Sequence, residues 1–225
     1  MSRRAMILAA GRGERMRPLT DQTPKPLLKV AGRPLIEHQI RRLAAAGWRD
    51  IVINLGWKGE QIRQALGDGS ELGVALRYSE EGWPALETGG GIHHALPLLG
   101  QQPFLVVNGD VWCEADFDRL RLADDDLACL LLVDNPDHNA DGDFALQQGR
   151  VRNQGGPRYT FSGIGLYHPE LFRDSPAGAW PLAPRLREAA EQQRLAGIHH
   201  AGPWLDVGTP ERLHQLNARL SGAEQ

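Results

Sequence analysis

The sequence predicts an α/β protein with a Rossmann-like open sheet, mixed but mostly parallel, flanked by helices. Short apolar runs such as residues 5–10 end at a glycine or a polar residue, as buried parallel strands do. Amphipathic segments follow these runs, for example residues 34–46, which carry an apolar stripe and are closed by Gly47. Alternating strands and helices favour right-handed βαβ units and therefore an open sheet.

The same two patterns place each element in order along the chain. Strands are expected at residues 5–10, 50–55, 74–79, 104–107 and 127–134, and helices at 34–46, 58–66, 88–99 and 116–122. The pattern then changes to a hairpin over 143–151 with Gly149 in its turn, a strand at 159–167, a helix at 182–195, a short strand at 204–207 and a closing helix at 211–220. A single domain over residues 1–225 accounts for this series.

Composition restricts the class of protein. Hydrophobic residues make up 41% of the 225 residues and charged residues 24%, as in soluble globular proteins. Two cysteines, Cys113 and Cys129, are too few for a disulfide framework or a four-cysteine zinc site, so we expect reduced thiols and a cytoplasmic location. No run approaches the ~20 apolar residues of a membrane span. The net charge is −3, but residues 1–50 hold eleven Lys and Arg against four Asp and Glu, which suits a small polyanionic ligand rather than a nucleic acid.

Three polar segments follow predicted strands, or the loops beyond them: residues 11–25, 87–91 and 108–110. Ligands of open α/β sheets bind outside the carboxyl ends of the strands, so these segments are expected to converge on one rim. Gly11-Arg12-Gly13 alone indicates only a tight turn or a phosphate contact. It is neither a Walker A loop nor the dinucleotide fingerprint, because Met16 occupies the position of the third glycine.

A longer motif is more specific. Leu8-Ala9-Ala10-Gly11-x-Gly13-x-Arg15-Met16, followed by Pro24-Lys25-Pro26, resembles the signature of the sugar-1-phosphate nucleotidyltransferases. The resemblance extends over nearly the whole chain and implies a fold like nucleotidyltransferase type A. It also implies that residues 1–135 form a nucleotide-binding half and residues 136–225 a sugar-binding half that supplies a second metal ligand.

The resemblance also implies roles for individual residues. Backbone groups at Ala10, Gly11, Arg12 and Gly13 would hold the triphosphate, and Arg15 would neutralise the departing pyrophosphate. Lys25 would bridge the α-phosphate and the incoming sugar phosphate. These roles suit the chemistry, since phosphoryl-type transfer needs positioning and charge neutralisation more than covalent catalysis. A structural lysine would rarely stand between two prolines, which fix the backbone and remove N–H donors.

A Mg²⁺ site is the second implication. Asp110 follows a strand in Asn108-Gly109-Asp110, and Asp206 lies in a late Asp-x-Gly-Thr-Pro segment that resembles the family's second metal ligand. Carboxylate oxygens are the ligands that Mg²⁺ prefers. Taken alone, Asp110 is equally consistent with a helix cap and Asp206 with a turn.

The substrate pocket is expected around the glycine run. In the family, Glu87-Thr88-Gly89-Gly90-Gly91 is the loop that admits the base against the backbone, with Gly90 as a nucleotide contact. Many members read the base with an earlier glutamine, and residues 65–100 contain none, so the base stays open. Further substrate-binding candidates are Asn108, Asp143, Glu81 and Glu87, with Asn54 as an additional pocket residue.

Within the family, the compact length and the segments at 87–91, 108–112 and 142–144 look most like a uridylyltransferase of cell-wall sugar recycling, which implies UTP as the nucleotide. Mannose, glucose or heptose 1-phosphate with GTP, dTTP or CTP are the alternatives. A nicotinamide-dependent dehydrogenase and a non-catalytic regulatory subunit are the hypotheses from other classes. The missing third glycine argues against the first, and the presence of Lys25, Asp110 and Asp206 against the second. The short C-terminus favours a monomer.

Overall fold

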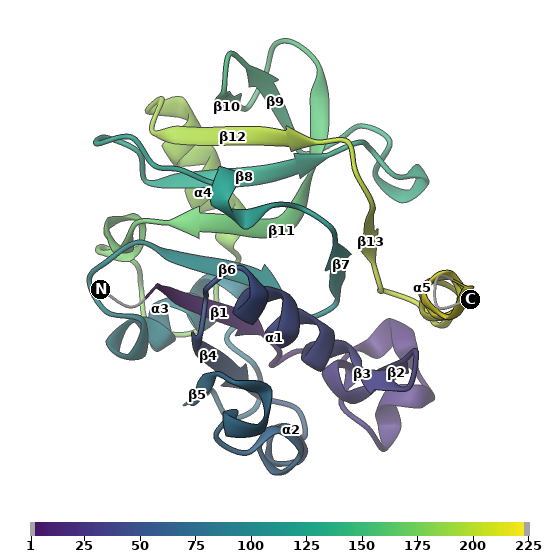
Figure 1. Ribbon diagram of the computed structural model, residues 1–225. Helices are drawn as coiled ribbons and strands as arrows, with labels where there is room; N and C mark the ends of the chain where they lie inside the picture. The colour runs from purple at the N-terminus through teal and green to yellow at the C-terminus, as the bar shows by residue number, and fades with distance from the viewer. Residues whose placement is uncertain (1–2, 223–225) are drawn as a thin grey trace.

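A computed structural model describes residues 3–222 (Figure 1). The helices are α1 Leu35–Ala45, α2 Gly59–Leu66, α3 Glu87–Leu99, α4 Leu182–Glu191 and α5 Pro210–Gly222. The strands are β1 Arg4–Leu8, β2 Lys29–Val30, β3 Arg33–Pro34, β4 Asp50–Leu55, β5 Ala75–Glu80, β6 Phe104–Asn108, β7 Val111–Cys113, β8 Ala128–Val133, β9 Phe144–Gln147, β10 Arg150–Arg152, β11 Arg158–Tyr167, β12 Leu195–His200 and β13 Trp204–Asp206.

The main sheet has nine strands in the order β5-β4-β1-β6-β11-β8-β12-β10-β9. Strands β5, β4, β1 and β6 pair in parallel, and β12 pairs in parallel with β8. β11 runs antiparallel to both β6 and β8, and β10 runs antiparallel to its neighbours β12 and β9. The expectation of a mostly parallel sheet therefore describes the first half of the chain, while the whole sheet is mixed.

Helices cover both faces of this sheet, as the alternation along β1 requires. Ala5 and Ile7 belong to one core, which also contains Ile36 and Ile40 of α1. Met6 belongs to the opposite core, which contains residues of α3 and α4. The apolar run of β1 is buried on both faces, which explains why it has no polar side.

A third, smaller cluster lies beside the main sheet. Val30 and Leu35, next to the β2–β3 hairpin, pack with Val207 and with Leu216 of α5. The Asn217 side chain accepts a hydrogen bond from the backbone N–H of Ala31 (2.8 Å). The last helix therefore packs against the segment that follows Lys25, and Figure 1 shows α5 beside β2 and β3.

Two expected helices differ from the structure, and strand β12 lies where no strand is expected. The helix expected at 116–122 is only a 3-10 turn, Phe117–Arg119, because the Asp116 carboxylate caps Asp118 N–H and the chain is extended again at Leu120. The helix expected at 182–195 ends at Glu191, since Gln193 adopts a left-handed φ of 58°. Leu195, the last residue of that expected helix, instead begins strand β12, Leu195–His200. Within residues 3–222, no helix combines the length and apolar character that crossing a bilayer requires.

Candidate active site

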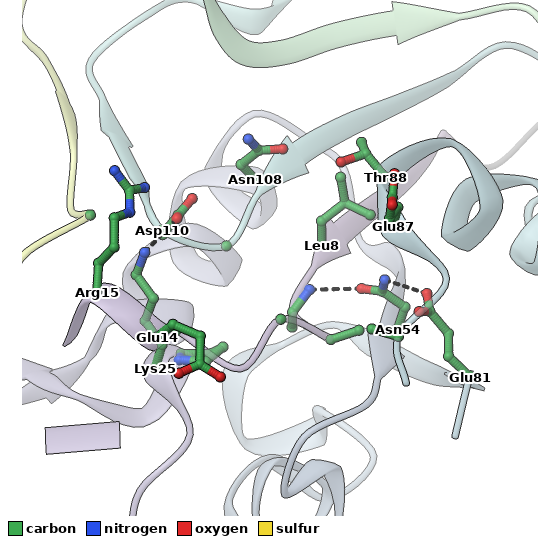
Figure 2. Close-up of a pocket in the computed structure, with 18 residues that line it drawn as sticks. Leu8, Glu14, Arg15, Lys25, Asn54, Glu81, Glu87, Thr88, Asn108 and Asp110 are labelled. Atoms are coloured by element: carbon green, nitrogen blue, oxygen red, sulfur yellow. Dashed lines mark hydrogen bonds and ion pairs between the residues drawn. The ribbon is translucent and has the colours of Figure 1, made fainter. Parts of the chain in front are cut away.

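A cleft of about 390 Å³ opens at the carboxyl ends of β1, β4, β5 and β6 (Figure 2). Its walls come from four segments that are far apart in the sequence: residues 8–26, Asn54, residues 81–88 and residues 108–110, with Gly208 at the edge. The predicted site residues that line it are Ala10, Gly11, Gly13, Arg15, Lys25, Glu81, Glu87, Asn108 and Asp110. The convergence expected from the three polar segments is therefore present.

The loop after β1 needs glycine at position 13. Gly13 has a left-handed φ of 68°, and a Cβ there would lie 3.0 Å from Thr20 Cγ2 and 3.2 Å from Lys25 Cβ. The Thr20 hydroxyl donates to the Gly13 carbonyl (2.9 Å), and Met16 N–H donates to the same carbonyl (2.9 Å). These contacts fold the loop back onto the segment that carries Lys25.

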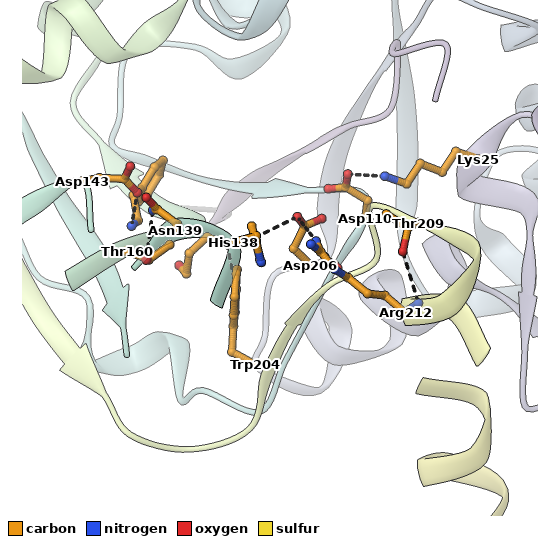
Figure 3. A network of polar contacts seen from close by, with 12 residues as sticks. Lys25, Asp110, His138, Asn139, Asp143, Thr160, Trp204, Asp206, Thr209 and Arg212 are labelled. Carbon is orange, nitrogen blue, oxygen red and sulfur yellow. Dashed lines mark hydrogen bonds and ion pairs between the residues drawn. The ribbon is translucent and has the colours of Figure 1, made fainter. Parts of the chain in front are cut away.

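Lys25 and Asp110 form an ion pair inside the cleft (Figures 2 and 3). Lys25 Nζ lies 2.5 Å from Asp110 Oδ2, and Lys25 is only 9% exposed. Pro24 is extended and Pro26 lies in the 3-10 turn Lys25–Leu27, which directs the lysine side chain inward. Gly109 N–H donates to the Leu8 carbonyl (2.9 Å), so Asp110 is held beside the end of β1. A buried lysine facing a partly exposed carboxylate is a suitable arrangement for binding phosphate groups and a cation together.

Asp206 approaches the site from the other end of the chain (Figure 3). β13 pairs with β7, and Val207 N–H donates to the Asp110 carbonyl (2.8 Å), so the backbones of the two aspartates are adjacent. The Asp206 carboxylate accepts from Arg212 Nη1 (2.8 Å), and His138 Nε2 lies 3.8 Å away.

Arg15 shares its surroundings with Asp206. A Cβ added at Gly208 would lie 3.0 Å from Arg15 Nη2 and 3.1 Å from Asp206 Oδ1. The ends of both side chains therefore lie beside Gly208, and a Cβ there would make a tight contact with each of them. Arg15 and Gly208 line the cleft, and the Asp206 carboxylate lies near them, outside the lining.

Asp206 and three other predicted residues lie outside the cleft lining. The Arg12 guanidinium stacks on Trp57 (3.9 Å to the ring centroid) and pairs with Glu14 (2.7 Å). Gly90 N–H donates to the Trp180 carbonyl (3.1 Å). The Asp143 carboxylate accepts from Phe161 N–H (2.7 Å). Their roles in substrate binding stay predictions.

Several side chains beside the site belong to no sequence motif and could not be found from the sequence. Arg212 and His138 contact Asp206 from α5 and from the turn Asp137–Asn139, and neither belongs to a recognisable pattern. The Arg12 guanidinium packs on the Trp57 ring because β4 ends beside the loop after β1. Contacts of this kind arise from tertiary proximity, which spacing along the chain does not reveal.

Comparison with known proteins agrees with this geometry. The family model described as nucleotidyl transferase matches residues 4–141. A protein of Neisseria meningitidis serogroup B named N-acetylmuramate alpha-1-phosphate uridylyltransferase is 55% identical, over 98% of this chain and 99% of that protein. A protein of the same name from Caulobacter vibrioides is 37% identical over 97% of each chain.

A solved structure also superimposes on the fold. It comes from Bacillus anthracis, is provisionally named a glucose-1-phosphate thymidylyltransferase, and matches with a TM-score of 0.82 and 25% identity over 96% of this chain and 94% of that one. The resemblance drawn from residues 8–26 is therefore confirmed. The chain belongs to the nucleotidyl transferase family.

Proposed function

We propose that this protein transfers the uridylyl group of UTP to N-acetylmuramate 1-phosphate, giving UDP-N-acetylmuramate and pyrophosphate. The observation that carries the reaction class is the Lys25–Asp110 pair in a cleft built by the loop after β1. The choice of sugar and base is supported by the near full-length similarity to the two proteins that bear that name.

The chemistry needs no strong general base. The sugar phosphate is already an anion near neutral pH, so one of its oxygens attacks the α-phosphorus of UTP. A new P–O bond forms as the bond between the α-phosphorus and the bridging oxygen breaks, and pyrophosphate leaves with that electron pair. Lys25 would bind the α-phosphate and the sugar phosphate, Arg15 the pyrophosphate, and backbone N–H groups of residues 10–13 the triphosphate.

We propose Asp110 and Asp206 as the residues that hold Mg²⁺. The donor set fits, since both are carboxylates on adjacent strand ends and Asp110 lines the cleft. Among residues 3–222, no group of three or more His, Cys, Asp or Glu side chains is arranged for a metal, and Mg²⁺ is commonly held by one or two carboxylates together with substrate phosphates. Bound there, Mg²⁺ would neutralise phosphate charge.

The sugar side of the proposal uses Asn108 and Asp143. Asn108 ends β6 in the cleft, with its amide close to Gly163 of β11, where an added Cβ would lie 2.5 Å from Asn108 Nδ2. Asp143 lies at the start of β9 in the second half of the chain. We further propose a cytoplasmic monomer that folds as one domain.

Pyrophosphate release over a panel of UTP, dTTP, CTP, GTP and ATP, each with N-acetylmuramate, N-acetylglucosamine, mannose and glucose 1-phosphates, tests the proposal. UTP with N-acetylmuramate 1-phosphate is expected to give the highest kcat/KM. A higher value with GTP and mannose 1-phosphate would instead favour a guanylyltransferase. The Lys25→Met variant gives the background rate of pyrophosphate release. If no pair of substrates gives release above that rate, the transferase assignment is excluded.

A further inference from the structure

We propose that Asn54 and Glu81 are positioning residues that influence which nucleotide is used. They connect the loop after β1, which would hold the triphosphate, to the glycine run at 87–91, which would admit the base. The proposal rests on the proposed function, because it concerns nucleotide binding in the same cleft. It gives Glu81 a role through the protein backbone rather than a direct contact with substrate.

The connection is a continuous series of three hydrogen bonds, and Figure 2 shows the two that Asn54 makes. Ala9 N–H, at the start of the phosphate loop, donates to Asn54 Oδ1 (2.7 Å). Asn54 Nδ2 donates to Glu81 Oε1 (2.6 Å), and Leu86 N–H donates to Glu81 Oε2 (2.8 Å). Leu86 is the residue directly before α3, the helix that contains the glycine run. One buried amide and one carboxylate thus join the ends of β1, β4 and β5 to the start of α3.

Burial makes the series sensitive to any change of partner. Asn54 is 3% exposed and lies between the buried apolar residues Ile53 and Leu55, where an unpaired polar group is costly. Both oxygens of Glu81 already accept hydrogen bonds from the protein. A Cβ at Gly91 would overlap Glu81 Oε1 and come within 3.1 Å of Asn54 Nδ2, so the glycine leaves space for this contact. The third glycine of the run therefore serves the series as well as the base loop.

The donors and acceptors allow a reciprocal exchange. Asn54→Asp alone removes the donor to Glu81 and brings two carboxylates together. Glu81→Gln alone places an amide donor against either Asn54 Nδ2 or Leu86 N–H. In the double variant, the carboxylate introduced at position 54 accepts from Ala9 N–H and from the new amide at position 81, whose oxygen accepts from Leu86 N–H. All three hydrogen bonds and the net charge are then restored.

The experiment measures KM for UTP and for the sugar phosphate, and the ratio of kcat/KM for UTP to that for CTP, at pH 8. Each single variant is expected to raise KM for UTP by roughly tenfold or more and to lower the UTP/CTP ratio, with KM for the sugar phosphate unchanged. The double variant is expected to return to within about threefold of the native protein. Asn217→Asp is the matched control, because Asn217 also accepts a backbone N–H, from Ala31, outside the cleft.

The outcomes separate the two proposals. A double variant no better than the worse single variant would overturn the positioning role, as expected if Glu81 contacts the base itself. If Asn54→Asp does not fold alone, a folded double variant is the rescue, and an unfolded one also overturns the role. If the native protein does not use UTP, the proposed function fails. The single and double variants can then still be compared by their Kd for whichever nucleotide binds.

Discussion

Replacing Lys25 by methionine removes the positive charge that the cleft directs at Asp110. The side chains have similar length, so the change removes the Nζ–Oδ2 contact of 2.5 Å without opening a large cavity. Two effects follow, one on stability and one on turnover, and the structure sets their sizes separately.

The stability effect is expected to be small. The Asp110 side chain is 30% exposed, so water and ions screen it after the lysine is removed. We expect a loss of about 1–2 kcal/mol rather than the ~3–5 kcal/mol of a fully buried pair. For a chain of this size, this corresponds to a fall of roughly 2–8 °C in Tm.

The effect on turnover is expected to be large, because the lysine charge would be used where phosphate charge develops. Removing one such donor costs on the order of 10²–10³ in kcat. The assay is pyrophosphate release with saturating UTP and N-acetylmuramate 1-phosphate, with Tm measured in the same buffer. A kcat within tenfold of the native value, with Tm lowered as above, would refute the assignment of Lys25 to the reacting phosphates.

Three other perturbations address separate parts of the molecule. Gly11→Ala is expected to leave Tm unchanged, since nothing in the protein lies within 4 Å of the added Cβ, but to raise KM for UTP at least roughly tenfold by intruding on the phosphate; equal KM values would remove Gly11 from the site. EDTA is expected to abolish pyrophosphate release and Mg²⁺ to restore it. Asp206→Asn is expected to require more Mg²⁺ than the native protein, whereas the surface variant Asp124→Asn should behave as native. An unchanged Mg²⁺ dependence in Asp206→Asn would exclude Asp206 as a ligand. Burial raises the pKa of Cys113 to about 11, so the protonated thiol stabilises the folded state below its unfolded pKa. The free energy of unfolding should therefore fall as the pH rises from the unfolded pKa of the thiol toward 11, and should fall less steeply in Cys113→Ala. Urea melts measure this free energy at each pH, and an identical pH dependence in the two proteins would contradict the prediction.

The parallel half of the sheet could be predicted because its strands are apolar on both faces. Most residues of β1, β4 and β6 are apolar and buried, and each strand leads into the cleft at its carboxyl end. Strand β12 was not predicted because Leu195–His200 contains a glycine and two histidines and lies close behind a helix. Its strand conformation comes from pairing with β8, and the helix ends early through a left-handed glutamine where glycine is the usual residue.

The site shows the same division. The position of the loop after β1 and of Asp110 in one cleft could be predicted, because both follow strands whose carboxyl ends meet at the same edge of the sheet. Arg12 illustrates what could not be predicted, since its side chain turns to Trp57 rather than into the cleft. Which face a loop side chain takes depends on an aromatic ring 45 residues away in the sequence, and no local pattern reports that contact.

The central position of β11 has a consequence for synthesis on the ribosome. β6 and β8 emerge early, yet the strand that lies between them begins at Arg158, about fifty residues after β6 ends. At typical elongation rates β6 waits roughly 2–10 s with an open, apolar edge. The cleft, although its walls come almost entirely from the first 110 residues, is expected to become rigid only after β11 has been inserted. A nascent chain stalled near residue 150 should therefore be open to proteolysis and to pairing with other chains, and one stalled so that β11 has left the ribosome should not.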